Sequence, residues 1–173
     1  MPGPNFETVV ADYYEPLYRF AISLTRSEAE ACDLAQQTFY MWAKKGHQLR
    51  DPSKAKSWLF TTLHRAFLET RRTLTRFPQA ELTETEDELP VILPEAAARL
   101  DALQAVEALG RVSELYRAPV ALFYLEDCSY QEIADMLEVP IGTVKSRMAR
   151  GLAELKLVFA GKHRARPQTG GQG

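Results

Sequence analysis

The sequence contains few of the residues that build metal sites, disulfides or covalent catalysis. Its two cysteines, Cys32 and Cys128, belong to no CxxC motif, and its three histidines, His47, His64 and His163, are dispersed. No carboxylate pair, metal triad, nucleophile motif or phosphate-binding loop is present. We therefore expect no enzyme activity, no metal and no cofactor, and two reduced, partly buried cysteines.

Long apolar runs and a signal peptide are also lacking. No run of apolar residues is long enough to cross a bilayer. Residues 1–8 are polar and charged only at Glu7, which does not resemble a signal peptide. We expect a cytoplasmic protein without membrane insertion.

Helical periodicity dominates the N-terminal half, which has no strand-like alternation of useful length. Apolar residues at steps of three and four predict a first helix with the stripe Val9, Tyr13, Leu17, Phe20 and Leu24. Ser27 opens a second helix and Gly46 ends it. Its inward positions are Ala31, Leu34, Ala35, Thr38, Phe39 and Trp42. A polar, basic loop with Pro52 at its turn precedes a third helix over 57–74, whose inward positions are Leu59, Leu63, Phe67 and Thr70.

A linker follows, in which prolines punctuate an acid-rich stretch from residue 76 to Pro94. Helices resume after Pro94, with an expected buried stripe of Leu100, Leu103, Val106 and Leu109. The remaining helices are expected over Arg117 to Leu125, entered through Pro119, then Tyr130 to Leu137 and Ile141 to Phe159.

The fold class is thus expected to be all-α, with two small helical domains joined by a flexible acidic linker. We expect the first domain over 6–74, the linker over 75–98, the second domain over 99–160 and a disordered basic tail over 161–173.

Charge is distributed unevenly along the chain. The overall net charge is −2, but residues 75–98 carry six acids and one base, so the rest of the chain carries +3. Residues 44–76 hold nine bases against two acids, and residues 139–173 hold seven bases against Glu154. Two basic zones separated by an acidic connector are typical of a protein with two contacts to a polyanion, although solvated charged faces could look similar.

A helix-turn-helix pattern lies near the C-terminus. Ser129 and Glu132 form a capping box for one helix, and Pro140 keeps that helix from continuing. In the next helix, five apolar residues are expected to pack inward: Ile141, Val144, Met148, Leu152 and Leu155. The opposite face has the composition of a major-groove reader: Thr143, Lys145, Ser146, Arg147, Ala149 and Arg150.

Three stretches together resemble a family. YRAPVALFYLEDCSYQEIADMLEVPIGTVKSRMARGLAELK, with its GTVKSR run, resembles region 4 of sigma factors; DLAQQTFYMWAKK and SWLFTTLHRAFLETRR resemble region 2. The chain is identified as a member of the sigma-70 family, of the extracytoplasmic-function (ECF) type. The resemblance implies an alternative sigma factor that binds core RNA polymerase and promoter DNA, with region 4 reading the minus-thirty-five element and touching the β flap.

The resemblance also implies roles for residues of the first half. Residues at the positions that bind the β′ clamp are Asp33, Gln36, Gln37, Phe39 and Trp42, of which we expect the last two to be buried and the first three to face outward. Residues implied for the minus-ten element and the melted strand are His47, Gln48, Leu49, Lys54, Lys56, Thr61, His64, Arg65, Arg71 and Arg72. Within this set, His47, Gln48 and Leu49 are candidates for capturing an extruded base, and we expect a surface position for His64.

Two residues of the third helix depart from the common family pattern. Arg65 stands where Asn is frequent, and Glu69 stands where Asp is frequent. Since an Arg replaces the paired donor and acceptor of an amide with a fixed charge, the promoter preference should differ from the commonest type. The family further implies an anti-sigma partner and a linker that threads near the polymerase active-site and RNA-exit channels. A solubilising tether is the alternative role for the linker.

Three other functions remain open from the residues. The first is a helix-turn-helix regulator that is not a polymerase subunit, although the first half lacks the strands of a receiver domain. The second is a nucleic-acid enzyme, for which no catalytic motif is found. The third is an adaptor that holds partners without reading DNA.

Overall fold

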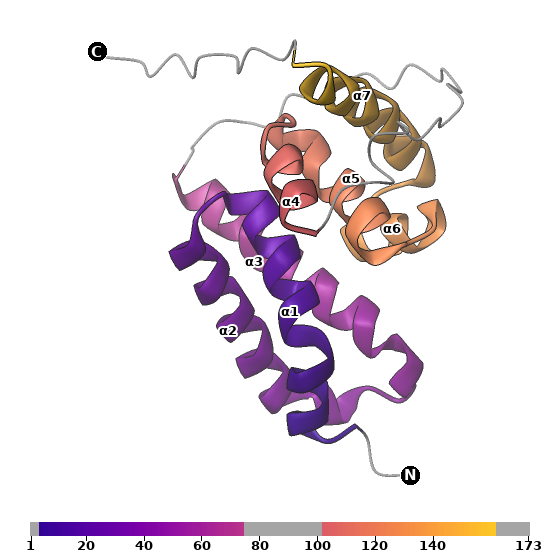
Figure 1. Cartoon of the computed structure of the whole chain (residues 1–173). Coiled ribbons are helices and arrows are strands. Elements are labelled where there is room, and N and C mark those ends of the chain that lie inside the picture. The colour runs from indigo at the N-terminus through magenta and orange to yellow at the C-terminus, as the bar shows by residue number, and fades with distance from the viewer. Residues whose placement is uncertain (1–3, 75–101, 162–173) are drawn as a thin grey trace.

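The computed structural model describes residues 4–74 and 102–161, and within these ranges it contains seven α-helices and no strand (Figure 1). The first three helices form the lower part of the molecule in Figure 1, and the last four form the upper part. The all-α expectation is confirmed. The acidic linker and the basic tail lie outside the described residues.

The N-terminal half consists of α1 (Phe6–Thr25), α2 (Glu28–Lys45) and α3 (Ala55–Leu74). Its helix ends follow from the sequence: the Asn5 side chain caps α1, and the Ser27 hydroxyl accepts from the Glu30 amide to cap α2. Short 3₁₀ turns at Gly46–Gln48 and Pro52–Lys54 fill the loop before α3. The six inward positions predicted for α2 are all buried, whereas Thr70 of α3 is exposed, so that prediction is wrong.

The C-terminal half consists of α4 (Ala102–Gly110), α5 (Glu114–Glu126), α6 (Tyr130–Leu137) and α7 (Ile141–Phe159). The predicted stripe on α4 is wrong at Leu103, which is 81% exposed, while Leu109 is buried. The start predicted for α5 is also wrong, because the helix begins before Arg117 and holds Pro119 buried in its interior. Ser113 is the N-cap residue of α5, and the carboxylate of Glu154 in α7 accepts both from the Ser113 amide at 2.7 Å and from its hydroxyl at 2.7 Å.

The two halves pack against each other in this structure. Helices α4 and α5 lie against α1, and α6 lies against α3 (Figure 1). Buried apolar side chains of both halves form one continuous cluster. A polar bond crosses the same boundary, because Arg117 of α5 donates to the backbone oxygen of Leu24 at 3.0 Å.

Both cysteines are free, and no helix in the described ranges is long and apolar enough to cross a membrane. Cys32 is half-buried and Cys128 is buried, as expected. Burial raises the pKa of the Cys128 thiol to about 11, so this side chain behaves as a small apolar group rather than as a nucleophile.

Candidate nucleic-acid interface

Helices α6 and α7 form the helix-turn-helix that the sequence predicts. At the start of α6 the capping box is complete: the Ser129 amide donates to the Glu132 carboxylate at 2.7 Å, and the Glu132 amide donates to the Ser129 hydroxyl at 3.2 Å. Because the box satisfies two otherwise unpaired amides, α6 begins at Tyr130.

A tight turn sets the angle between the two helices. Glu138 ends α6 in the left-handed conformation, with φ of 57°, and its amide donates to the Ala134 oxygen. Pro140 then caps α7, because its oxygen accepts from the amides of Thr143 at 3.0 Å and Val144 at 3.2 Å. The turn therefore satisfies its own backbone groups and fixes where α7 starts.

Helix α7 packs against α5 along one face. Four of the five predicted apolar positions are buried: Val144, Met148, Leu152 and Leu155. Ile141 is 40% exposed, so that prediction is wrong; it lies in the first turn, beyond the packed face. Sequence reasoning missed Gly151, where a Cβ would lie 2.5 Å from Cγ2 of Val120. The missing side chain allows the backbone of α7 to approach α5 closely.

The six residues of the predicted reading face are not among the buried residues of α7, and one of them, Arg147, lines a cavity beside His64 of α3. Lys145 is exposed, and the other predicted readers are half-buried: Thr143, Ser146, Arg147, Ala149 and Arg150. The Ser146 hydroxyl donates to the Thr143 oxygen at 3.1 Å. Within the described residues Lys145 and Arg150 form no ion pair, so their charges are available to a polyanion.

The predicted polymerase-facing residues of α2 divide into two groups. Asp33, Gln36 and Gln37 are exposed, and Phe39 and Trp42 are buried, which confirms the expected orientations. The two aromatic residues therefore pack beneath the helix, and the three polar side chains lie on its exposed face.

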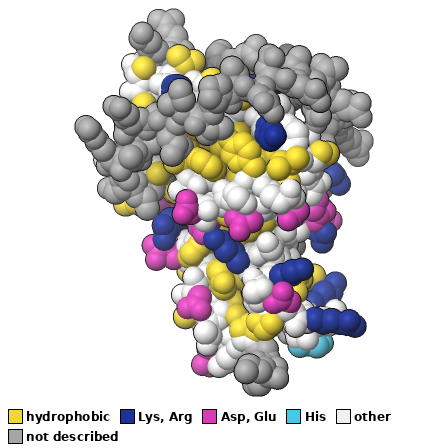
Figure 2. All heavy atoms as spheres, turned by 90° about the vertical axis from the view of Figure 1, so that its right-hand side faces the viewer, with side chains coloured by type: hydrophobic (Ala, Val, Ile, Leu, Met, Phe, Trp, Pro, Cys, Tyr) yellow, Lys and Arg dark blue, Asp and Glu magenta, His cyan; other side chains and the backbone are white. Residues whose placement is uncertain are grey.

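A cavity of about 340 Å³ opens beside the loop between α2 and α3. His47 and Leu49 line it, together with the aromatic rings of Phe6 and Trp42 and the guanidinium-bearing Arg50. Gln48 is exposed but is not among the lining residues. Figure 2 shows Lys and Arg side chains gathered beside a histidine at this end of the molecule. Phe6 was missed because it precedes the loop by some forty positions in the sequence, whereas Arg50 directly follows Leu49 and could have been included.

Several cations of the minus-ten set point toward the C-terminal half. Lys56, Arg65 and Arg71 each form an ion pair with a carboxylate of that half. Other members remain on the open surface: Lys54 and Arg72 are exposed, and Thr61 is half-buried.

His64 is buried at the boundary between the halves, with only 8% of its surface exposed, so the predicted surface position is wrong. It lies on the face of α3 covered by the C-terminal half, in a cavity of about 490 Å³ that Arg147 also lines. Burial, together with the positive charge of Arg147, lowers the pKa of His64 from 6.5 to about 4. The imidazole is therefore neutral near neutral pH.

No group of His, Cys, Asp and Glu side chains that could hold a metal ion occurs in the described part of the chain. The geometry instead offers two basic helices, α3 and α7, and an aromatic cavity. These features are suited to binding nucleic acid.

Comparisons with known proteins agree with that geometry. The family model described as Sigma-70 region 2 matches residues 9–77, and the model described as Sigma-70, region 4 matches residues 102–155. ECF RNA polymerase sigma factor SigM of Bacillus subtilis is 30% identical over 85% of this chain and 90% of its own length. The chain belongs to the sigma-70 family, in its ECF group.

Other relatives place the chain in the same group. ECF RNA polymerase sigma factor SigE of Mycolicibacterium smegmatis is 33% identical over 92% of this chain, which spans 63% of that relative's length. The solved structure of the sigma factor RpoE from Bartonella quintana, in complex with the anti-sigma factor NepR, has a TM-score of 0.68 and 27% identity, covering 91% of this chain and 98% of that one. This chain is accordingly an alternative sigma factor, a subunit that directs RNA polymerase to promoters. A regulator that is not a polymerase subunit is not favoured.

Proposed function

We propose that this ECF sigma factor contacts promoter DNA through two separate surfaces and core RNA polymerase through two more. Helix α7 reads the minus-thirty-five element, and α3 with the preceding loop reads the minus-ten element and holds the melted strand. The observation that carries the proposal is the pairing of a complete helix-turn-helix with a second basic helix in the matched region 2.

On α7 the minus-thirty-five contacts are assigned to the six residues of the reading face: Thr143, Lys145, Ser146, Arg147, Ala149 and Arg150. Arg and Lys side chains pair with guanine edges or phosphates, and the half-buried Ala149 allows close approach to the groove.

On the region 2 side, the cavity beside the loop receives an extruded base. His47 and Leu49 lie on its wall, and the exposed ring of Phe6 supplies a face on which a base can stack, while the buried Trp42 forms the base of the cavity. Lys54 and Arg72 are exposed and follow the phosphates of the melted strand. The remaining members of the minus-ten set lie outside the cavity lining: Gln48, Lys56, Thr61, His64, Arg65 and Arg71.

Contacts with three protein partners complete the function: the β′ clamp, the β flap and an anti-sigma protein. The exposed Asp33, Gln36 and Gln37 of α2 bind the β′ clamp, and the C-terminal half binds the β flap. An anti-sigma protein is a further partner, in line with the complex in which the similar Bartonella protein was solved. The chain performs no catalytic step itself and works in the cytoplasm with the polymerase that it directs.

Reconstitution with core RNA polymerase tests this function. Wild-type chain should bind core enzyme and give promoter-selective transcripts, and Gln36→Ala/Gln37→Ala should weaken core binding without altering the helical content. A chain that does not bind core polymerase would contradict the proposal. If Lys145→Ala/Arg147→Ala/Arg150→Ala left promoter-directed transcription intact, α7 would not read DNA and an adaptor role would be favoured.

A further inference from the structure

Ile141, the first residue of α7, is a large apolar side chain that the core does not use. The periodicity of the helix predicts an inward position for it, yet its side chain is 40% exposed. Among the described residues it belongs neither to the buried apolar cluster nor to the partly buried apolar side chains packed against that cluster. The packing of α7 on α5 therefore does not account for an Ile at this position.

The start of α7 is open around this side chain. Pro140, Gly142 and Lys145 are exposed as well, and Gly142 has no side chain that could cover its neighbour. Because the Cα–Cβ bonds of a helix tilt toward its amino end, the Ile141 side chain extends past the first turn. Lys145 follows four residues later and is its neighbour on the helix surface. An apolar group and a cation thus lie side by side at the amino end of α7.

The first turn of α7 also lacks the carboxylate that several other helices carry there. Glu7, Glu28, Glu114 and Glu132 stand in the first turns of α1, α2, α5 and α6, where the helix dipole favours a negative charge. The first turn of α7 has no acidic residue. Since a carboxylate at this place would repel DNA phosphates, its absence suits an end of the helix that approaches DNA.

The chemistry of Ile limits what it can recognise in DNA. In a helix-turn-helix the second helix contacts base edges mainly through its amino-terminal residues. An Ile side chain has no donor or acceptor, so it forms no hydrogen bond with a phosphate or with a polar base edge. Among the four standard bases only thymine presents a methyl group in the major groove, and apolar side chains are the groups that contact it.

We propose that Ile141 reads one thymine of the promoter through the C5-methyl group of that base. The contact lies outside the six-residue reading face of α7 and adds an apolar, base-specific element to it. It rests on the proposed function, because it requires α7 to enter the major groove. It goes further by naming one base and one chemical group that α7 selects.

The experiment removes that methyl group alone. Wild-type holoenzyme first selects duplexes from a pool randomised over the minus-thirty-five region, and each thymine of the preferred duplex is then replaced singly by 2′-deoxyuridine. At one thymine the replacement should weaken binding to wild-type holoenzyme about fourfold, the effect of one buried methyl group. Ile141→Ala should bind the unmodified duplex more weakly and should no longer distinguish thymine from deoxyuridine at that position.

Leu157→Ala is the matched control. Leu157 is apolar, 47% exposed and near the other end of the same helix, so its truncation removes a comparable side chain away from the recognition end. For each variant the affinity is expressed as the ratio between the two duplexes, which cancels a general loss of binding. The control should keep the wild-type ratio, and Ile141→Val, which retains a branched apolar side chain, should keep most of it.

The same deoxyuridine profile in wild type and Ile141→Ala would overturn this inference. So would a wild-type holoenzyme that is indifferent to every thymine methyl group in the region. If Lys145→Ala/Arg150→Ala still weakens binding in those cases, the proposed function stands and only the role of Ile141 is lost. If the wild-type chain forms no holoenzyme with core polymerase, the proposed function fails and the thymine contact fails with it.

Discussion

Helices α3 and α7 carry similar basic faces but meet different surroundings. On α7 the packed face is turned to α5 and the cations Lys145 and Arg150 form no ion pair with any described residue. On α3 the cations Lys56, Arg65 and Arg71 pair with carboxylates of the other half, although Arg65 stays 66% exposed and Arg71 also pairs with Glu30 of α2 at 4.0 Å. The difference teaches that basic side chains make a helix able to bind nucleic acid. Carboxylates on neighbouring helices determine whether those side chains are free to do so.

The largest expected effect comes from removing the open charges of α7. Lys145→Ala/Arg150→Ala should lower transcription from a promoter that depends on the minus-thirty-five element about 30-fold or more, since each base contact contributes about 1–3 kcal/mol. The slope of the logarithm of the duplex-binding constant against the logarithm of salt concentration should also become shallower by about two. Lys156→Ala, an exposed charge near the end of the same helix, is the control and should change little. Equal losses in both variants would show that α7 contributes only its overall charge.

Packing at Gly151 is what keeps the face of α7 outward, so Gly151→Ala should weaken that arrangement. A Cβ there would meet Val120 at 2.5 Å and Tyr116 at 3.1 Å, and overpacking of this kind costs about 1–3 kcal/mol. The free energy of unfolding in urea should fall by that amount. The double variant Gly151→Ala/Val120→Ala should recover part of the loss, and no recovery would place the strain elsewhere.

Lowering the pH should favour separation of the C-terminal half from α3. His64 has a pKa of about 4 when the halves are packed and should return toward 6.5 when they separate, so the open state binds the proton more tightly. The packed state is therefore most favoured above 6.5 and loses stability as the pH falls from 6.5 toward 4, by up to about tenfold in the opening equilibrium per pH unit.

The charged groups that line the same cavity with His64 are Arg71, Arg72, Glu114, Glu138 and Arg147. Measurements between pH 7.5 and 5 cover the range in which His64 gains a proton on opening, and Glu126, whose pKa burial raises, is a second titratable group at the boundary. Small-angle scattering should show an expanded chain at the lower pH, and His64→Gln should remove most of that response. A response that survives the substitution would assign the effect to another group.

The smallest expected effect separates two arginines of α3. Arg72→Ala should make the slope of the logarithm of the oligothymidylate-binding constant against the logarithm of salt concentration shallower by about 0.7. This is the change expected for the loss of one phosphate contact with a single strand. Arg65→Ala should cost the free chain less affinity than Arg72→Ala, because it also releases Glu138 and favours opening. In holoenzyme, where the halves are held on the polymerase, the two variants should differ much less.

Local patterns in the sequence predicted the elements and their inward faces well. Ser27, the capping box at Ser129 and the turn at Pro140 act over a few residues, so their positions could be predicted directly. The inward face of α2 followed from its periodicity for the same reason. Exposed Asp33, Gln36 and Gln37 were predicted because a helix with a buried stripe has only one other side.

The errors have two sources, an overlooked local signal and contacts that join residues distant in the sequence. The start of α5 carries a local signal that was overlooked, because Ser113 is its N-cap residue and Glu114 stands in its first turn. A contact with Glu154, forty-one positions beyond Ser113, adds to it. His64 was expected on the surface because α3 already had a complete apolar stripe facing α1 and α2. Its burial comes from the C-terminal half, which periodicity within one helix does not describe.

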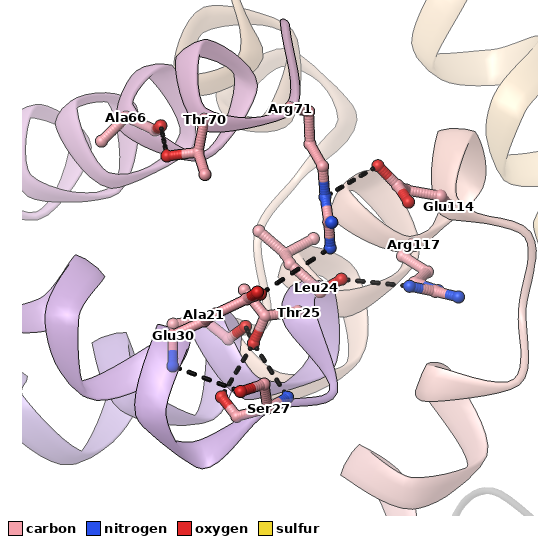
Figure 3. Close-up of polar contacts among 10 residues, drawn as sticks. All are labelled: Ala21, Leu24, Thr25, Ser27, Glu30, Ala66, Thr70, Arg71, Glu114 and Arg117. Carbon is pink, nitrogen blue, oxygen red and sulfur yellow. Dashed lines mark hydrogen bonds and ion pairs between the residues drawn. The ribbon is translucent and has the colours of Figure 1, made fainter. Parts of the chain in front are cut away.

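The bond from Arg117 to Leu24 has a consequence that no side chain of α1 controls (Figure 3). The acceptor is a main-chain oxygen near the carboxyl end of α1, where the aligned peptide dipoles concentrate partial negative charge. A guanidinium is attracted to that end whatever residue occupies position 24. The carboxyl end of the first helix thus serves as a docking point for the second half. Side-chain substitutions in α1 can leave this docking point in place, because its acceptor is a main-chain oxygen.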